Sequence, residues 1–135
     1  MAADPPAPAG WRVLQLTLAL LGAAACTTLS FLVALKPNST GAFAFGALWL
    51  TLPHTALAGL MLALQRHGTP VLPWCLAALL VTAGGLYIHV DAIWLHPDAQ
   101  GAIAVMITPV LQGIAFVLAA PLAWWMGRRH REQAG

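Results

Sequence analysis

Four long apolar runs constrain this chain more than any other feature of its sequence. Residues 11–35, 39–65, 72–95 and 99–126 are each long enough to cross a bilayer, which takes about 20 residues of helix. Because lipid offers no partner to an unpaired main chain, such segments fold as helices. The sequence therefore predicts an all-α integral membrane protein, a bundle of four transmembrane helices.

Little of the chain remains outside these runs. Only 7% of the residues are charged, against about a quarter in soluble domains. We expect residues 1–10 to form a disordered tail rich in Pro and Ala, residues 11–127 one membrane domain, and residues 128–135 a basic tail. Arginines at the end of a span usually orient a membrane protein, so we expect no nucleic-acid partner.

One phrase occurs twice in the chain. Residues 35–45 read LKPNSTGAFAF, and residues 95–105 read LHPDAQGAIAV, at an offset of 60. Proline stops one helix, and Asn or Asp then caps the next. The expected hairpin-turn residues are Pro37, Asn38, Pro97 and Asp98. We interpret the spans as two tandem helical hairpins, which arose either by duplication or by convergence of two tight turns.

Small residues mark where helices are expected to pack closely, because they let two backbones approach. Two patches fall at one depth in the first and third spans, and a Gly-Ala pair follows each repeated turn. The expected packing residues are Gly22, Ala25, Gly84, Gly85, Gly41 and Gly101.

Basic residues predict the orientation. Arg12, Arg66 and the three arginines of residues 128–131 fall on one side of the expected bundle, and only Lys36 falls on the other. The positive-inside rule then places both termini in the cytoplasm. The chain resembles small four-span proteins of bacterial inner membranes, so we expect a multi-pass protein of the cytoplasmic (inner) membrane.

Polar groups inside spans are expensive, and each one is a functional hypothesis by default. By counting along the helices, we expect a middle layer and an outer layer, with Thr28, Ser30 and Thr108 level with the outer one. The candidate polar or transport site comprises Asp91 and His89 in the outer layer and His54 and Gln112 in the middle layer.

Asp91 has two interpretations. It either accepts a proton or cation in an outward-facing polar pocket, or it lies near the membrane surface, where it is hydrated or hydrogen-bonded to a hydroxyl on the first span. His89 and Asp91 lie two residues apart, so their side chains point about 200° from each other on a helix. At most one of them is therefore expected to face the bundle centre.

We expect no cofactor, no metal and no catalytic residue. Counted at 1.5 Å per residue, His54 and His89 differ by about 10 Å in depth, which is unsuitable for haem ligands. No nucleophile–base arrangement or pair of carboxylates is present. His54 follows Pro53, and we expect it to bond the carbonyl of Trp49 or Leu50 that the proline frees.

The leading functional hypothesis is a non-enzymatic accessory or interaction subunit of a larger membrane complex, or a homo-oligomer. Its expected partners are the lipid bilayer and other membrane proteins or further copies of itself. The alternative is a small proton- or cation-coupled transporter or channel that uses Asp91 with His89 or His54. A third hypothesis is an immunity-type protein that protects against a membrane toxin.

Overall fold

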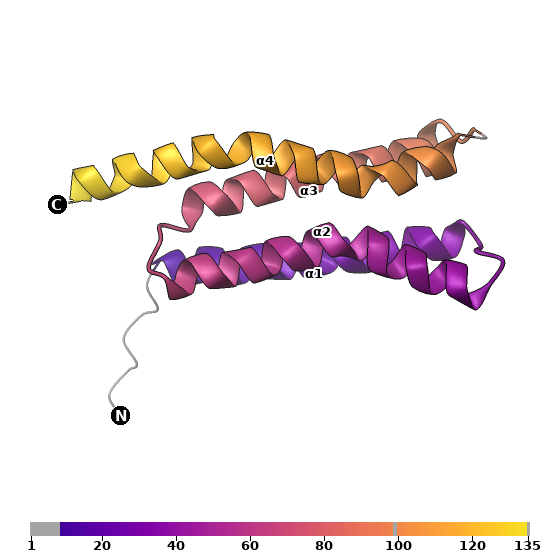
Figure 1. The fold of residues 1–135 in the computed structure, drawn as a ribbon, viewed down its shortest axis with the longest axis horizontal. Helices are drawn as coiled ribbons and strands as arrows, with labels where there is room; N and C mark the ends of the chain where they lie inside the picture. Colours follow the sequence, from indigo (N-terminus) through magenta and orange to yellow (C-terminus); the bar gives the residue numbers. More distant parts are fainter. Residues whose placement is uncertain (1–8, 99, 135) are drawn as a thin grey trace, which may run out of the picture.

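The computed structural model describes residues 9–98 and 100–134, and these residues form four long helices (Figure 1). The helices are α1 (Ala9–Ala34), α2 (Thr40–Arg66), α3 (Leu72–Val90) and α4 (Gly101–Ala134), with a π-helical turn η1 (Asp91–Leu95) that continues α3. No strand occurs among the described residues. All four helices are long and apolar enough to span a membrane. The prediction of an all-helical fold is confirmed, and the four candidate spans indicate a multi-pass membrane protein.

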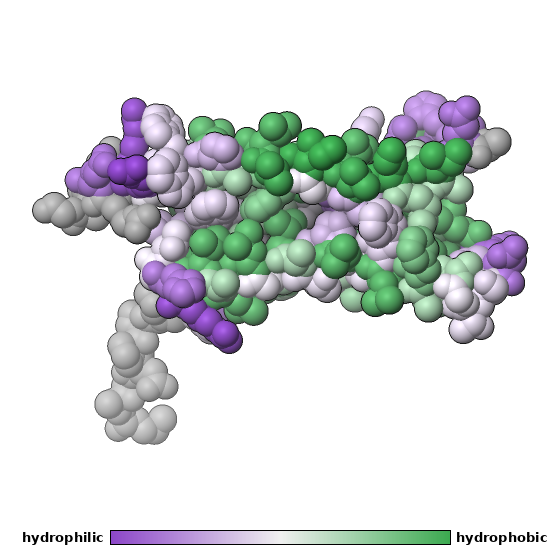
Figure 2. Space-filling view, in the orientation of Figure 1, coloured by the Kyte–Doolittle hydropathy of each residue, from purple (hydrophilic) through white to green (hydrophobic). Residues whose placement is uncertain are grey.

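The helices pack side by side as one bundle. α1 packs mainly along α2 and α3 mainly along α4, while contacts of α1 with α3 and of α2 with α4 close the bundle. The start of α1, the α2–α3 connection and the end of α4 lie at one end, here called the terminal end (Figure 1). The other two connections lie at the opposite end, the turn end. Hydrophilic residues gather at both ends, with a hydrophobic band between them (Figure 2).

The connection from α1 to α2 is a tight reversal that includes Pro37 and Asn38. Lys36, just before the proline, adopts a left-handed backbone with φ of 50°. The residue that caps α2 is Ser39, whose hydroxyl oxygen accepts the N–H of Ala42 at 3.1 Å. Asn38 lies in the turn as predicted, but the predicted cap is one residue too early because α2 begins at Thr40.

The connection from η1 to α4 is built differently. The main-chain N–H of His96 donates to the carbonyl of Asp91 at 2.8 Å and closes the π-helical turn. After Pro97, the carboxylate of Asp98 accepts the N–H of Gln100 at 2.8 Å. The carbonyl of Asp98 also accepts the N–H of Gly101 at 3.2 Å. Asp98 therefore organises the start of α4, as the sequence suggested.

The two ends of the chain differ from the expected tails. Helix α4 does not stop near residue 126 but continues to Ala134. The guanidinium carbon of Arg128 lies 4.8 Å from the ring centre of Trp124, and that of Arg129 lies 3.8 Å from that of Trp125. These pairs are four residues apart, so they form only if the helix continues. Of the expected disordered tail, residues 1–8 lie outside the described residues, and residues 9–10 open α1.

Two apolar clusters fill the core. The cluster nearer the terminal end consists of Leu14, Leu21, Leu57, Met61, Val71, Cys75 and Ala78. The cluster nearer the turn end consists of Leu32, Leu50 and Val105. The polar residues described next lie between these two clusters.

Candidate functional site

Each of the four helices contributes at least one buried polar side chain to the bundle interior. Four of these side chains, here called the histidine layer, are those of Thr28 (α1), His54 (α2), His89 (α3) and Thr108 (α4), which are 0%, 2%, 1% and 0% exposed. Such groups are costly to bury unless they are hydrogen-bonded, which makes their partners the central question.

Thr28 and His54 bond one another. The Thr28 hydroxyl lies 2.8 Å from the Ala24 carbonyl of its own helix and 3.2 Å from Nε2 of His54. A hydroxyl has one proton to donate. Because the Thr28 hydroxyl donates this proton to the Ala24 carbonyl, its oxygen is left to accept the Nε2–H of His54. His54 is then protonated on Nε2, and its Nδ1 is a bare, buried acceptor without a partner among the described residues.

His89 has no hydrogen-bond partner for either ring nitrogen within the described part of the chain. Phe31 packs edge-on against its ring, with centroids 5.5 Å apart and an interplanar angle of 72°. The main chain of Val105 on α4 faces the ring at a geometry that falls short of a hydrogen bond. His54 and His89 are brought near one another by α1, where Thr28 contacts the first ring and Phe31, one turn further along, contacts the second.

These contacts correct the depth estimate made from the sequence. Thr28 and Phe31 are three residues apart, so they are neighbours on one face of α1, and each contacts one histidine. The two rings therefore lie against adjacent turns of α1 and not in separate layers. Counting residues failed because it assumed that all helices start at one level. The expected bond from His54 to a carbonyl freed by Pro53 is replaced by the bond to Thr28.

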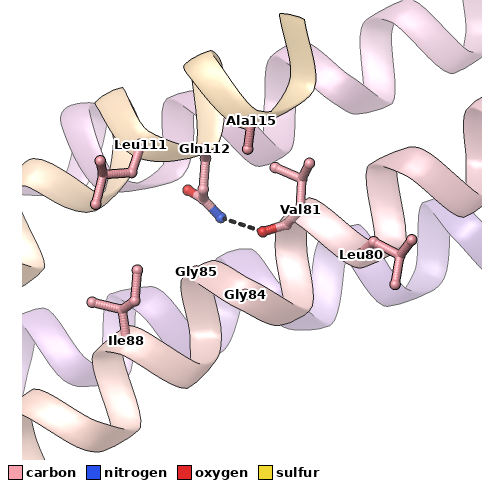
Figure 3. Close-up of a pocket in the computed structure, with 8 residues that line it drawn as sticks. All are labelled: Leu80, Val81, Gly84, Gly85, Ile88, Leu111, Gln112 and Ala115. Carbon is pink, nitrogen blue, oxygen red and sulfur yellow. Dashed lines mark hydrogen bonds between the residues drawn. The ribbon is translucent and has the colours of Figure 1, made fainter. Parts of the chain in front are cut away.

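Gln112 lies next to the histidine layer, one turn beyond Thr108 on α4. It is 4% exposed, and its Nε2 donates to the carbonyl of Val81 on α3 at 3.5 Å (Figure 3). Its side chain lies over Gly85, where an added Cβ would overlap it. Gln112 also borders a surface groove of about 320 Å³ between α3 and α4, whose α3 wall includes Gly84 and Gly85.

Asp91 does not join the buried residues. It heads η1, its side chain is 37% exposed, and its Oδ1 lies 2.8 Å from Nδ1 of His96, which is 79% exposed. Both residues line a pocket of about 370 Å³ at the turn end, together with Asp98, Gln100 and the start of α4. Of the pair that sequence reasoning left open, His89 faces the bundle interior and Asp91 faces outward.

The expected packing residues divide into three groups. An added Cβ would overlap the Gln112 side chain at Gly85, and at Gly101 it would lie 2.7 Å from the carbonyl oxygen of Ala92. Ala25 is half-buried. Among the described atoms, a Cβ would meet nothing within 4 Å at three further positions: Gly22, Gly41 and Gly84.

Sequence reasoning missed Gly46 and undervalued Thr28. A Cβ on Gly46 would lie 2.7 Å from Cδ1 of Leu32 on α1. Thr28 was noted only as level with the outer layer, yet it binds His54. One signal was available, because Thr17, Ala24 and Thr28 recur at the spacing of one helix face, and all three are buried.

The chemistry open to this site is binding and proton transfer. In the described residues, no group of three or more His, Cys, Asp or Glu side chains is arranged to hold a metal ion. Comparisons of this chain with protein-family models, with curated proteins and with solved structures find no match.

Proposed function

We propose that this chain is a small, non-enzymatic membrane protein that works in an assembly, either beside a larger membrane complex or as a homo-oligomer. One observation carries the proposal, the groove between α3 and α4. It combines the exposed apolar side chains of Leu80 and Leu111 with Gly84, where an added Cβ meets no described atom within 4 Å. Close approach of a further helix at small residues is how membrane helices associate.

The test is the mass of the assembly. The full-length protein is extracted in mild detergent and weighed by native mass spectrometry. We expect a defined species heavier than the monomer. Gly84→Leu, which fills the groove, is expected to reduce that species to the monomer. Gly59→Leu is the matched control, because a Cβ at this exposed α2 glycine also meets no described atom within 4 Å. A monomeric wild-type protein, or equal effects of the two variants, would refute the proposal.

The proposed topology is two tandem hairpins in a bacterial inner membrane, with both termini in the cytoplasm. Support comes from the arginines: Arg12, Arg66 and Arg128 lie toward the terminal end, and Lys36 lies at the turn end. Single cysteines at Arg66 and Gln100, in a chain without its native cysteines, test the orientation. We expect an impermeant maleimide to label position 100 in intact cells and position 66 only after lysis. Labelling of position 66 in intact cells and of position 100 only after lysis would refute the proposed orientation.

A second candidate function is proton- or cation-coupled transport, favoured by the histidine layer. Buried ionisable groups in spans commonly mark ion or proton paths. Asp91 and His96 would then serve the outer entrance, while His89 and His54 would lie on the internal path. Asp91→Asn in reconstituted vesicles tests this form of the idea. Loss of flux supports a role for Asp91, and unchanged flux removes Asp91 from the path.

A further inference from the structure

The histidine layer contains more hydrogen-bond acceptors than donors. The hydroxyls of Thr28 and Thr108 both donate to carbonyls of their own helices, to Ala24 at 2.8 Å and to Ala104 at 2.9 Å. Nε2–H of His54 is used by Thr28. The described contacts leave as free acceptors Nδ1 of His54, one ring nitrogen of His89 and lone pairs of both threonine hydroxyls, against one free N–H on His89.

No described side chain brings a donor to the free ring nitrogens: the unpaired hydroxyl of Thr82 lies about two turns before His89 on α3, and the Gln112 amide donates to the Val81 carbonyl. Phe31 on α1 packs edge-on against the His89 ring, and on α4 the main chain of Val105 faces this ring as an acceptor and not as a donor. The nearest carboxylate along the chain, that of Asp91, is paired with His96 in the outer pocket. Apolar clusters lie on both sides of the layer along the bundle. Any group that satisfies the free ring nitrogens must therefore be small, because these atoms are buried, and it must bring its own hydrogens.

We propose that a water molecule bridges Nδ1 of His54 and the ring of His89, and that the two imidazoles exchange a proton through it. Water supplies two O–H donors and two lone pairs, which complements the excess of acceptors and the one free N–H of His89. This inference deepens the second candidate function, on which it rests, by placing the proton site in the bundle core and not at Asp91.

The exchange is balanced in atoms and charge. A proton that reaches the free nitrogen of His89 makes this ring an imidazolium. The imidazolium gives an N–H proton to the bridging water as the water gives one of its own protons to Nδ1 of His54. His89 returns to the neutral form, His54 becomes the imidazolium with Nε2–H still on Thr28, and the water is regenerated. Neutral histidine suits this role because each ring has one donor and one acceptor.

The first measurement is nitrogen NMR on full-length protein with ¹⁵N-labelled histidine, in vesicles of phosphatidylethanolamine and phosphatidylglycerol. We expect His54 to carry its proton on Nε2, and we expect water protons to transfer magnetisation to both buried rings. Thr28→Val is expected to shift the tautomer of His54 without unfolding the bundle, since it keeps the shape of the side chain. Dry rings, or a bound ammonium or metal ion in place of water, would overturn the water site.

The second measurement is proton uptake by vesicles that hold a trapped pH-sensitive dye, driven by a potassium diffusion potential. We expect His54→Gln and His89→Gln to lower uptake to the rate of protein-free vesicles. His67→Gln is the control, because His67 is exposed in the α2–α3 connection. Hydrated rings without wild-type uptake would refute the transport function and leave the water site standing. Uptake that survives both substitutions would refute the exchange.

Discussion

Gly85 offers the sharpest test of the packing, because its neighbour Gly84 provides a control in the next position of the chain. A Cβ added at Gly85 would overlap the carboxamide of Gln112 and lie 3.0 Å from its Cγ, whereas at Gly84 it would meet no described atom within 4 Å (Figure 3). The Gln112 side chain would have to move, and its bond to the Val81 carbonyl would be lost.

The expected change in the free energy of unfolding combines two destabilising terms and one stabilising term. Overpacking a well-filled site costs about 1–3 kcal/mol, and an interhelical hydrogen bond in a membrane adds about 0.6 kcal/mol. Alanine is favoured over glycine in a helix interior by about 0.5–1 kcal/mol. We therefore expect Gly85→Ala to lower the free energy of unfolding by about 1–2 kcal/mol, and Gly84→Ala to leave it unchanged or raise it slightly.

Truncating Gln112 is expected to reverse the sign of the effect that Gly85→Ala has on the free energy of unfolding. In a Gln112→Ala background the obstructing side chain is absent, so Gly85→Ala is expected to stabilise the bundle by about 0.5–1 kcal/mol. The assay is equilibrium unfolding by dodecyl sulfate in mixed micelles, followed by helical circular dichroism, for the wild type, both single variants and the double variant. Equal effects of Gly85→Ala in the two backgrounds would show that Gln112 is not the obstacle.

Three further predictions use the same unfolding assay. Gly101→Ala is expected to cost about 1–3 kcal/mol, because its Cβ would lie 2.7 Å from a main-chain carbonyl that cannot rotate away, while Gly41→Ala is expected to be neutral; equal costs would contradict this. Lys36→Gly is expected to stabilise the protein by a few tenths to about 1 kcal/mol, because glycine adopts the φ of 50° without strain, and a loss of stability would contradict the argument. Ser39→Ala is expected to cost about 1 kcal/mol through the lost cap of α2, and Asn38→Ala much less; the reverse order would restore Asn38 as the cap.

The sequence predicted the bounds of most helices well, because the thickness of a bilayer determines the length of each span. Spans 11–35, 39–65 and 72–95 match the observed helices to within two residues at each end, counting η1 with α3. These bounds follow from hydrophobic length and from prolines and polar residues at the turns, which are local features. The continuation of α4 beyond residue 126 was not predicted, because composition alone favours a basic tail from residue 128, whereas Arg128 and Arg129 pair with tryptophans one helical turn earlier.

Which side chains point into the bundle and which point outward was harder to predict, for a physical reason. A helix of a soluble protein has an apolar buried face and a polar face exposed to water, but both faces of a membrane helix are apolar. Nothing local distinguishes Gly84, which is exposed, from Gly85, which packs under Gln112. The pairing of Thr28 with His54 likewise depends on how far α2 is displaced along α1, which is a tertiary property.

The repeated phrase shows how similar sequences reach different packing. Both copies reverse the chain after a proline, yet Ser39 caps α2 through its hydroxyl, while Asp98 organises the start of α4 through its carboxylate and carbonyl. Only the second copy follows a π-helical turn, and only there does the glycine lie against a carbonyl of the preceding segment. What the two copies share is therefore the requirement to reverse the chain. The polar pocket beside the second copy is lined both by Asp91 of the π-helical turn and by residues of the phrase itself, among them His96, Asp98 and Gly101.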